Sequence, residues 1–230
     1  MKLYTYLIPV DDGAAPNPYG GVCTLVICKP QIRRVAQEHD WVVGIGAKHT
    51  WTGWSRGVDR SRSVIYAMKL DAPMSMEDYD HHVKTTLPIK RPDWGDTDHH
   101  LALGDAIYDF SQGSRGSPAI RNKSVHGVAE RAKDLSGRNA LLSKHFYYFG
   151  SQAIRLPDHL LPIVPVQQGF RSTSNAAHLA DFVAWIEGLG LTPGIQVNAQ
   201  PTMDILSEPR CTTRCKRKAA AKREGRTTKC

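Results

Sequence analysis

The amino-acid sequence predicts an α+β fold, namely a small and mostly antiparallel β-barrel with short helices at its rim. The apolar segments are short, as expected for strands rather than for long helices. A single crossover helix separates consecutive strands in the first half of the chain, which argues against a doubly wound parallel sheet. The 230 residues suit one domain with additions, and a hydrophobic content of 41% is enough to bury a core.

The first half of the chain supplies most of the predicted strands. Residues 3–10 and 63–70 are rich in β-branched and aromatic side chains, and residues 22–28 form a nearly continuous apolar run. Pro30 suits the first position of a short helix, after which residues 41–45 form the next strand. This succession predicts a strand, a helix and a strand around residues 15–46, the segment on which the rest of the chain is organised.

The second half is predicted to be less regular. Ser75 and Asp78 resemble a capping box that opens a short helix. Residues 85–137 are rich in Gly, Pro, Asp and His and are interpreted as an irregular insertion that holds one short strand at 106–110. Residues 139–149 are the last strong strand.

A C-terminal amphipathic helix is predicted after a proline-rich connector at 156–170, with Asn175 as its N-cap. Its apolar stripe should dock on the barrel or sheet and consists of Ala176, Leu179, Phe182, Val183 and Ile186. The predicted organisation is therefore a main domain at 1–170 that includes the 85–137 insertion, a docking helix at 171–190 and a disordered basic tail at 200–230.

The net charge of +8 belongs to the tail. Residues 210–230 hold nine Lys or Arg and one acid, whereas the preceding residues hold 21 basic and 21 acidic side chains. A basic tail on a neutral body is typical of an electrostatic nucleic-acid tether, and the alternative is a tail kept for solubility.

Five cysteines without a framework pattern favour a reducing cytoplasm. The N-terminus is interpreted as a strand rather than a signal peptide, and no apolar run is long enough for a membrane span, so no membrane partner is expected.

Four polar residues at the joints of the 15–46 segment are predicted to bind a nucleotide: Asn17, Lys29, Arg33 and Arg34. The basic residues flank a helix start, where a phosphate could bind, and Asn17 could offer its amide to a base edge. The alternative is a solvated helix face beside a side-chain-stabilised turn.

The polar loop at 48–62 adds Trp51, Trp54 and Arg56 to the predicted nucleotide-binding residues. Tryptophans among arginines suit stacking on a splayed base with phosphate contacts beside it. The alternative is that the two indole rings cover the core.

The candidates for acid–base catalysis are His99, His100, Asp98 and Asp105 in the insertion. Adjacent histidines point apart and lack the spacing of a helical zinc site, so no metal and no cofactor is expected. A polar surface loop is the alternative reading of this cluster. Cys28 lies at a strand end, but the sequence assigns it no His–Asp partner.

Several blocks resemble a known family, namely APNPYGGVCTLVICKPQIRR, HDWVVGIGAK, SVIYAMKLDAPMSMEDY, LGDAIYDF and SKHFYYFG. Together they are similar to the nucleotide modification associated domain, type two, of bacteria and bacteriophages. The resemblance covers roughly residues 1–160 and implies a role near enzymes that modify DNA bases, without implying a reaction. It also implies that the cytoplasm is that of a bacterium or of a phage-infected host cell. A looser similarity runs to PUA-like folds such as the EVE and ASCH domains, which hold a modified base in a pocket.

The sequence thus predicts a DNA-modification associated protein that binds a nucleotide or a modified base through a PUA-like pocket, with DNA or a nucleotide as partner and the tail as tether. One alternative is an enzyme of nucleobase or nucleotide hypermodification, acting by group transfer or hydrolysis through the His/Asp cluster. A second alternative is a non-catalytic subunit that accompanies base-modifying enzymes. Whether the protein is an enzyme is left open at this level.

Overall fold

The computed structural model describes residues 1–50, 57–93, 96, 98–114, 116–121, 125–194 and 201, with His99 and His100 described by their backbone. The strands are β1 (Leu3–Ile8), β2 (Cys23–Leu25), β3 (Trp41–Gly46), β4 (Ser63–Lys69), β5 (Met74–Ser75), β6 (Tyr108–Ser114), β7 (Ser117–Ile120), β8 (Asn139–Ser143), β9 (His145–Tyr148), β10 (Ile154–Arg155) and β11 (Phe170–Arg171). The helices are α1 (Pro30–Val35), α2 (Met76–Thr85), α3 (His99–Ala102), α4 (Val128–Leu135) and α5 (Leu179–Glu187), with 3₁₀ turns η1 (Pro88–Lys90), η2 (Gly150–Gln152), η3 (Asp158–Ile163) and η4 (Thr173–His178).

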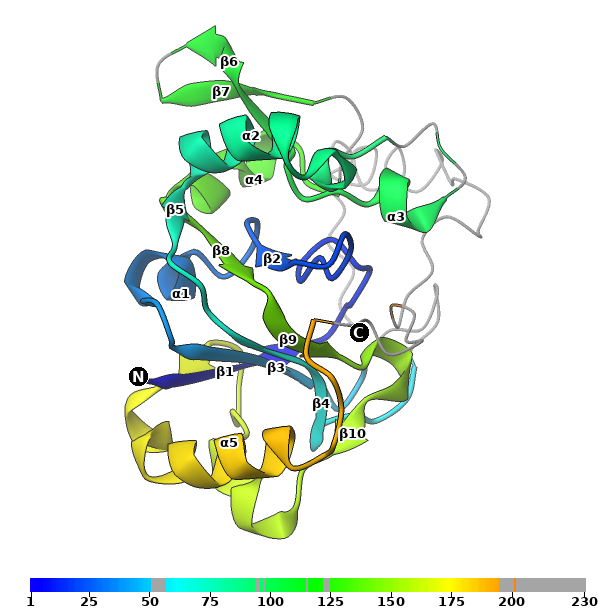
Figure 1. Cartoon of the computed structure of the whole chain (residues 1–230), viewed down its shortest axis with the longest axis vertical. Helices are drawn as coiled ribbons and strands as arrows, with labels where there is room; N and C mark the ends of the chain where they lie inside the picture. Colours follow the sequence, from blue (N-terminus) through cyan, green and yellow to red (C-terminus); the bar gives the residue numbers. More distant parts are fainter. Residues whose placement is uncertain are drawn as a thin grey trace, which may run out of the picture.

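A six-stranded sheet crosses the lower half of the molecule in Figure 1, with α5 beneath it. Its order is β10-β4-β3-β1-β11, and β9 also pairs with β4. The β1–β3 pair is parallel, because β2 and α1 form the crossover between these strands, and the other pairs of this sheet are antiparallel. The crossover brings the start of α1 close to the C-terminal end of β1.

A second, three-stranded sheet of order β2-β8-β5 lies above the first in Figure 1. The predicted strand at 139–149 supplies both sheets, because β8 pairs with β2 while β9 pairs with β4. The chain changes sheets at Lys144. There the Ser143 hydroxyl donates hydrogen bonds to the carbonyls of Lys69 and His145, at 2.5 and 2.8 Å.

Both faces of the six-stranded sheet are buried, as the near-continuous apolar strands require. Tyr4, Tyr6 and Ile8 pack toward β2, β8 and α1 on one face. On the other face, Trp41 stacks edge-on against Phe182 of α5 at a centroid distance of 5.7 Å. The helix α5 therefore packs on this face of the sheet (Figure 1).

The predicted cap of that helix is wrong, since His178 occupies the N-cap position of α5. Asn175 lies in η4 and is buried. Its amide donates to Leu3 O and to Thr5 Oγ1, at 3.1 and 3.0 Å. Asn175 therefore fastens the C-terminal segment to β1 instead of starting the helix.

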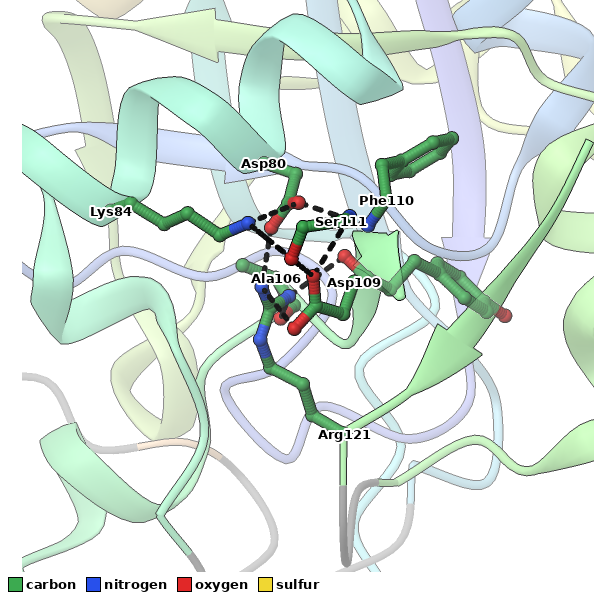
Figure 2. Close-up of polar contacts among 8 residues, drawn as sticks. Asp80, Lys84, Ala106, Asp109, Phe110, Ser111 and Arg121 are labelled. Atoms are coloured by element: carbon green, nitrogen blue, oxygen red, sulfur yellow. Dashed lines mark hydrogen bonds and ion pairs between the residues drawn. The ribbon is translucent and has the colours of Figure 1, made fainter. Parts of the chain in front are cut away.

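The 85–137 insertion is more regular than predicted, since it contains α3, the β6–β7 hairpin and α4. An ion network fastens the hairpin to α2 (Figure 2). Arg121 Nη2 lies 2.5 Å from Asp80 Oδ1, and Lys84 Nζ lies 3.0 Å from Asp80 Oδ2 and 3.3 Å from Asp109 Oδ1. Hydrogen bonds lower the pKa of Asp109 to about 2, and the largest effect is that of the Ser111 hydroxyl.

The α+β class is confirmed, with more strand than helix and with short helices. Among the described strands no closed barrel is found, since they form one six-stranded, one three-stranded and one two-stranded sheet. The PUA-like barrel therefore stays a prediction. Within the described residues, no helix is long and apolar enough to cross a membrane.

Candidate functional site: a cysteine, a histidine and an aspartate in one pocket

Cys28 occupies a strained turn between β2 and α1. Its φ angle is 61° and that of Lys29 is 39°, a left-handed conformation that side chains other than glycine adopt rarely. The Cys28 N–H donates to Asp134 Oδ1 at 2.9 Å, and Arg33 Nε donates to the Cys28 carbonyl at 2.8 Å. Strain of this kind persists only where the surroundings impose it and is frequent at functional sites.

His126 and Asp134 complete a three-residue array with this cysteine. His126 Nε2 lies 3.5 Å from Cys28 Sγ, and His126 Nδ1 lies 2.6 Å from Asp134 Oδ2. The Tyr108 hydroxyl donates to the same Oδ2 atom at 2.9 Å, and Asp134 is almost fully buried. A hydrogen bond from Nδ1 to the carboxylate turns Nε2 toward sulfur, which is the arrangement of a nucleophile, a base and an orienting acid.

The charges of the array support this assignment. Burial works to lower the pKa of His126, but hydrogen bonds with Asp134 and Cys28 outweigh it and raise that pKa to about 10. Burial works to raise the pKa of Asp134, and the hydrogen bond of His126 outweighs it, so that pKa is lowered. His126 is therefore an imidazolium at neutral pH, and its Nε2–H can donate a hydrogen bond to the Cys28 sulfur.

Arg33 connects the turn that holds Cys28 to the segment that holds Asp134, through hydrogen bonds to backbone carbonyls of both. Besides the Cys28 carbonyl, its guanidinium donates to the carbonyl of Asn139 at 2.8 Å and to the carbonyl of Asp134. Burial lowers the pKa of Arg33 to about 10. Gly137 makes room for it, since a Cβ there would lie 2.7 Å from Nη1. Arg33 thus ties the nucleophile turn to α4 and β8.

The array opens into a cavity of about 420 Å³. Its walls come from the start of α1, from α4 and from the segment that enters β11. The lining residues are Cys28, Lys29, Pro30, Gln31, Ile32, His126, Glu130, Lys133, Asp134, Gly169 and Phe170. The cavity therefore offers the cysteine, two lysines and an aromatic ring to one small ligand.

Some of the residues predicted to bind a nucleotide lie at the cavity and others lie away from it. Lys29 lines the cavity, whereas Arg33 lies buried behind it and Arg34 is exposed outside its lining. Trp51, Trp54 and Arg56 lie outside the described residues, as does the predicted basic tail apart from residue 201.

Asn17 and Asp105 belong to a separate buried network, which corrects two predictions. Asn17 donates to Leu103 O at 2.8 Å and accepts from Lys90 Nζ at 2.6 Å, so its amide is not presented to a base edge. Asp105 accepts 2.6 Å hydrogen bonds from Thr24 Oγ1 and Tyr79 OH and is fully buried, so it does not face a substrate. Burial lowers the pKa of Lys90 to about 8 and raises that of Asp105.

Of the other predicted acid–base residues, only Asp98 has a described side chain, and Asp98 does not line the cavity. Asp98 is exposed at the start of α3, and only the backbone of His99 and His100 is described. In the described part of the chain no group of three or more His, Cys, Asp or Glu is arranged to hold a metal ion.

Sequence reasoning missed the partners of Cys28 because they are distant in the chain. His126 follows Cys28 by 98 residues and Asp134 follows it by 106. The signal for this site in the sequence is Cys28 at a strand-to-helix junction. Its partners lie in the 85–137 segment, for which the sequence predicts no regular structure around His126 and Asp134.

The fold and the array define an α+β protein with a thiol–imidazole–carboxylate site in a small cavity. The chain belongs to the family described as nucleotide modification associated domain 2, whose model matches residues 1–208. The family description associates the chain with nucleotide modification. Neither a search of curated proteins nor a search of solved structures gives a match.

Proposed function

We propose that the protein is a cysteine-dependent enzyme of nucleotide or DNA modification, with Cys28 as nucleophile in acyl transfer or acyl hydrolysis. The observation that carries this proposal is the Cys28–His126–Asp134 array, with sulfur 3.5 Å from Nε2 and Nδ1 2.6 Å from Oδ2. A thiolate beside an imidazolium that a carboxylate orients is suited to attack on an acyl carbon.

The first half of the reaction makes a thioester. Sulfur attacks the carbonyl carbon of the substrate and forms an S–C bond, and the carbonyl electrons move onto oxygen. When the carbonyl re-forms, the bond to the leaving group breaks, and His126 Nε2 gives its proton to the departing atom. Neutral His126 and an acylated Cys28 remain.

The second half returns the enzyme to its starting state. His126 accepts a proton from an incoming hydroxyl, amine or water, which attacks the thioester carbon. The S–C bond then breaks and sulfur leaves as a thiolate beside the regenerated imidazolium. Asp134 touches no reacting atom and positions the ring through Nδ1.

Acylation by p-nitrophenyl acetate tests this proposal in the full chain. We expect a burst of p-nitrophenolate and one acetyl group on the peptide that contains Cys28. p-Nitrophenolate leaves without a proton, so acetylation reports how readily the sulfur is activated. His126→Ala should slow acetylation of Cys28 by about 10²-fold or more, because it removes the base that takes up the thiol proton. Cys23→Ser is the matched control, because Cys23 is a free cysteine buried in β2. Equal acetylation rates in His126→Ala and the parent would refute the assignment.

The second candidate is recognition without chemistry, in which a nucleotide or modified base occupies the pocket of a PUA-like fold and the basic tail tethers DNA. The cavity of about 420 Å³, with Phe170 and two lysines on its walls, supports binding of such a ligand. Titration with DNA and with nucleotides, using Cys28→Ser beside the parent, separates the two. Tight binding without any acylation of Cys28 would favour the second candidate. DNA affinity with the same salt dependence in a chain that ends at residue 206 would remove the tail from it.

A further inference from the structure

Two lysines share the cavity with Cys28 and have no carboxylate partner among the described residues. Lys29 Nζ donates to Leu7 O at 3.3 Å and lies 4.4 Å from the centre of the Tyr6 ring. Lys133 projects from α4 and is exposed. In the described part of the chain, neither ammonium has a carboxylate oxygen within 4.0 Å, although both line the cavity.

The two acidic residues of the cavity are engaged elsewhere. The Glu130 carboxylate accepts the Gly127 N–H at 2.9 Å and so caps the start of α4. The Asp134 carboxylate holds His126, Tyr108 and the Cys28 N–H. Both carboxylates are thus bonded to groups of the protein itself, and neither forms an ion pair with Lys29 or Lys133, the two lysines that line the cavity.

The positive charges of Lys29 and Lys133 also repel each other across the cavity. Burial lowers the pKa of Lys29, Cys28 opposes that effect and Lys133 adds to it. Two like charges on the walls of one cavity repel, and a bound anion relieves that repulsion. Their approach is therefore more favourable with an anionic ligand in place.

We infer that Lys29 and Lys133 form an anion-binding subsite. This subsite selects substrates that carry a carboxylate or phosphate close to the carbon that Cys28 attacks. This inference rests on the proposed function, since it concerns the substrate of the same nucleophile. It narrows the substrate class to acidic acyl compounds, and Phe170 and Pro30 supply apolar contacts beside the anion.

Paired alkylating reagents test the subsite without knowledge of the natural substrate. Iodoacetate carries a carboxylate and iodoacetamide of the same size does not. With either reagent the Cys28 sulfur bonds to the methylene carbon, the C–I bond breaks and iodide leaves with the electron pair. The rates for Cys28 are measured in the full chain by peptide mapping, and their ratio reports the preference for an anion.

We expect Lys133→Met and Lys29→Met each to lower the iodoacetate-to-iodoacetamide ratio by about three- to fivefold, as expected for loss of one partly screened charge. Lys144→Met removes an exposed lysine outside the cavity and should leave the ratio unchanged. Protection of Cys28 by inorganic phosphate but not by acetate would indicate a phosphate ligand, and the reverse a carboxylate ligand.

An unchanged ratio in both cavity variants, with Cys28 still reactive, would overturn the subsite and leave the proposed function standing. Failure of the proposed function has a different signature. In that case Cys28 reacts slowly with both reagents, and His126→Ala has no effect on either rate.

Discussion

Replacing Asp134 by asparagine should lower the pKa of His126 by about one to two units. The Asp134 carboxylate accepts from His126 Nδ1 at 2.6 Å, and with Cys28 it holds the pKa of His126 at about 10 against the effect of burial. A hydrogen bond between charged groups contributes about 1.5–3 kcal/mol, and about 1.4 kcal/mol corresponds to one pKa unit. Asparagine has nearly the same shape as aspartate, so the substitution removes the charge while it keeps the volume of the side chain.

The measurement is an NMR titration of the histidine ring nitrogens in the ¹⁵N-labelled full chain, with the His126 signal assigned from its loss in His126→Gln. The matched control is Asp158→Asn, which removes an exposed carboxylate at the start of η3. It should leave His126 unchanged. A His126 that titrates near its ordinary value of about 6.5 in the parent, or identically in Asp134→Asn, would refute the proposed array.

The same pKa has a consequence for stability. His126 has a folded-state pKa raised above its unfolded value, so its contribution is present below about pH 6.5 and is lost as pH rises through about 10. The free energy of unfolding of the parent should therefore fall across this interval more steeply than that of His126→Gln. Urea unfolding at several pH values measures both slopes, and parallel curves would contradict the raised pKa.

Three further predictions concern the framework of the site. Gly137→Ala should destabilise the protein by about 2–4 kcal/mol in urea unfolding, because the added Cβ displaces the hydrogen-bonded Arg33. Gly127→Ala is the control. Its added Cβ lies 3.7 Å from the nearest atom, so the free energy of unfolding should change by less than about 1 kcal/mol. Arg121→Met should cost about 3–5 kcal/mol, because it leaves the buried Asp80 carboxylate with only Lys84 and a backbone N–H; a loss no larger than that of Lys144→Met would contradict this. Asp109, with a pKa of about 2, contributes stability above about pH 4 that is lost as pH falls through about 2, so thermal melts should show a smaller acid-induced loss in Asp109→Asn.

The local elements were predictable from the sequence where their cause is local. Pro30 at the first turn, the Ser75–Asp78 cap and the apolar strands of the central sheet all follow from neighbouring residues. The role of Asn175 was not predictable, because its amide bonds to β1 residues about 170 positions away. The same holds for Asn17, whose side chain is taken by Lys90 and Leu103 inside the protein. A polar side chain that the sequence suggests for binding a partner can instead form hydrogen bonds with backbone that is distant in the sequence.

The site was only half predictable for the same reason. Cys28 and Lys29 stand out at a strand-to-helix junction, but the sequence carries no spacing that connects them to His126 and Asp134. The connection depends on tertiary contacts of Arg33 and Tyr108, neither of which has a local signature.

The insertion is therefore part of the site rather than an addition to the fold. It supplies the histidine, the aspartate and the Tyr108 hydroxyl, while the segment from β2 to α1 supplies the cysteine and the arginine. Buried bonds fasten the two parts together, since Lys90 Nζ donates to the carbonyls of Asn17 and Val22 at 2.9 and 2.6 Å. Because Lys90 is fully buried and bonds to the segment that leads into β2, this network fixes the insertion against the strand that precedes Cys28. A site assembled in this way requires the whole region from β1 to β8, in agreement with a family match that spans residues 1–208 without a break between the two parts.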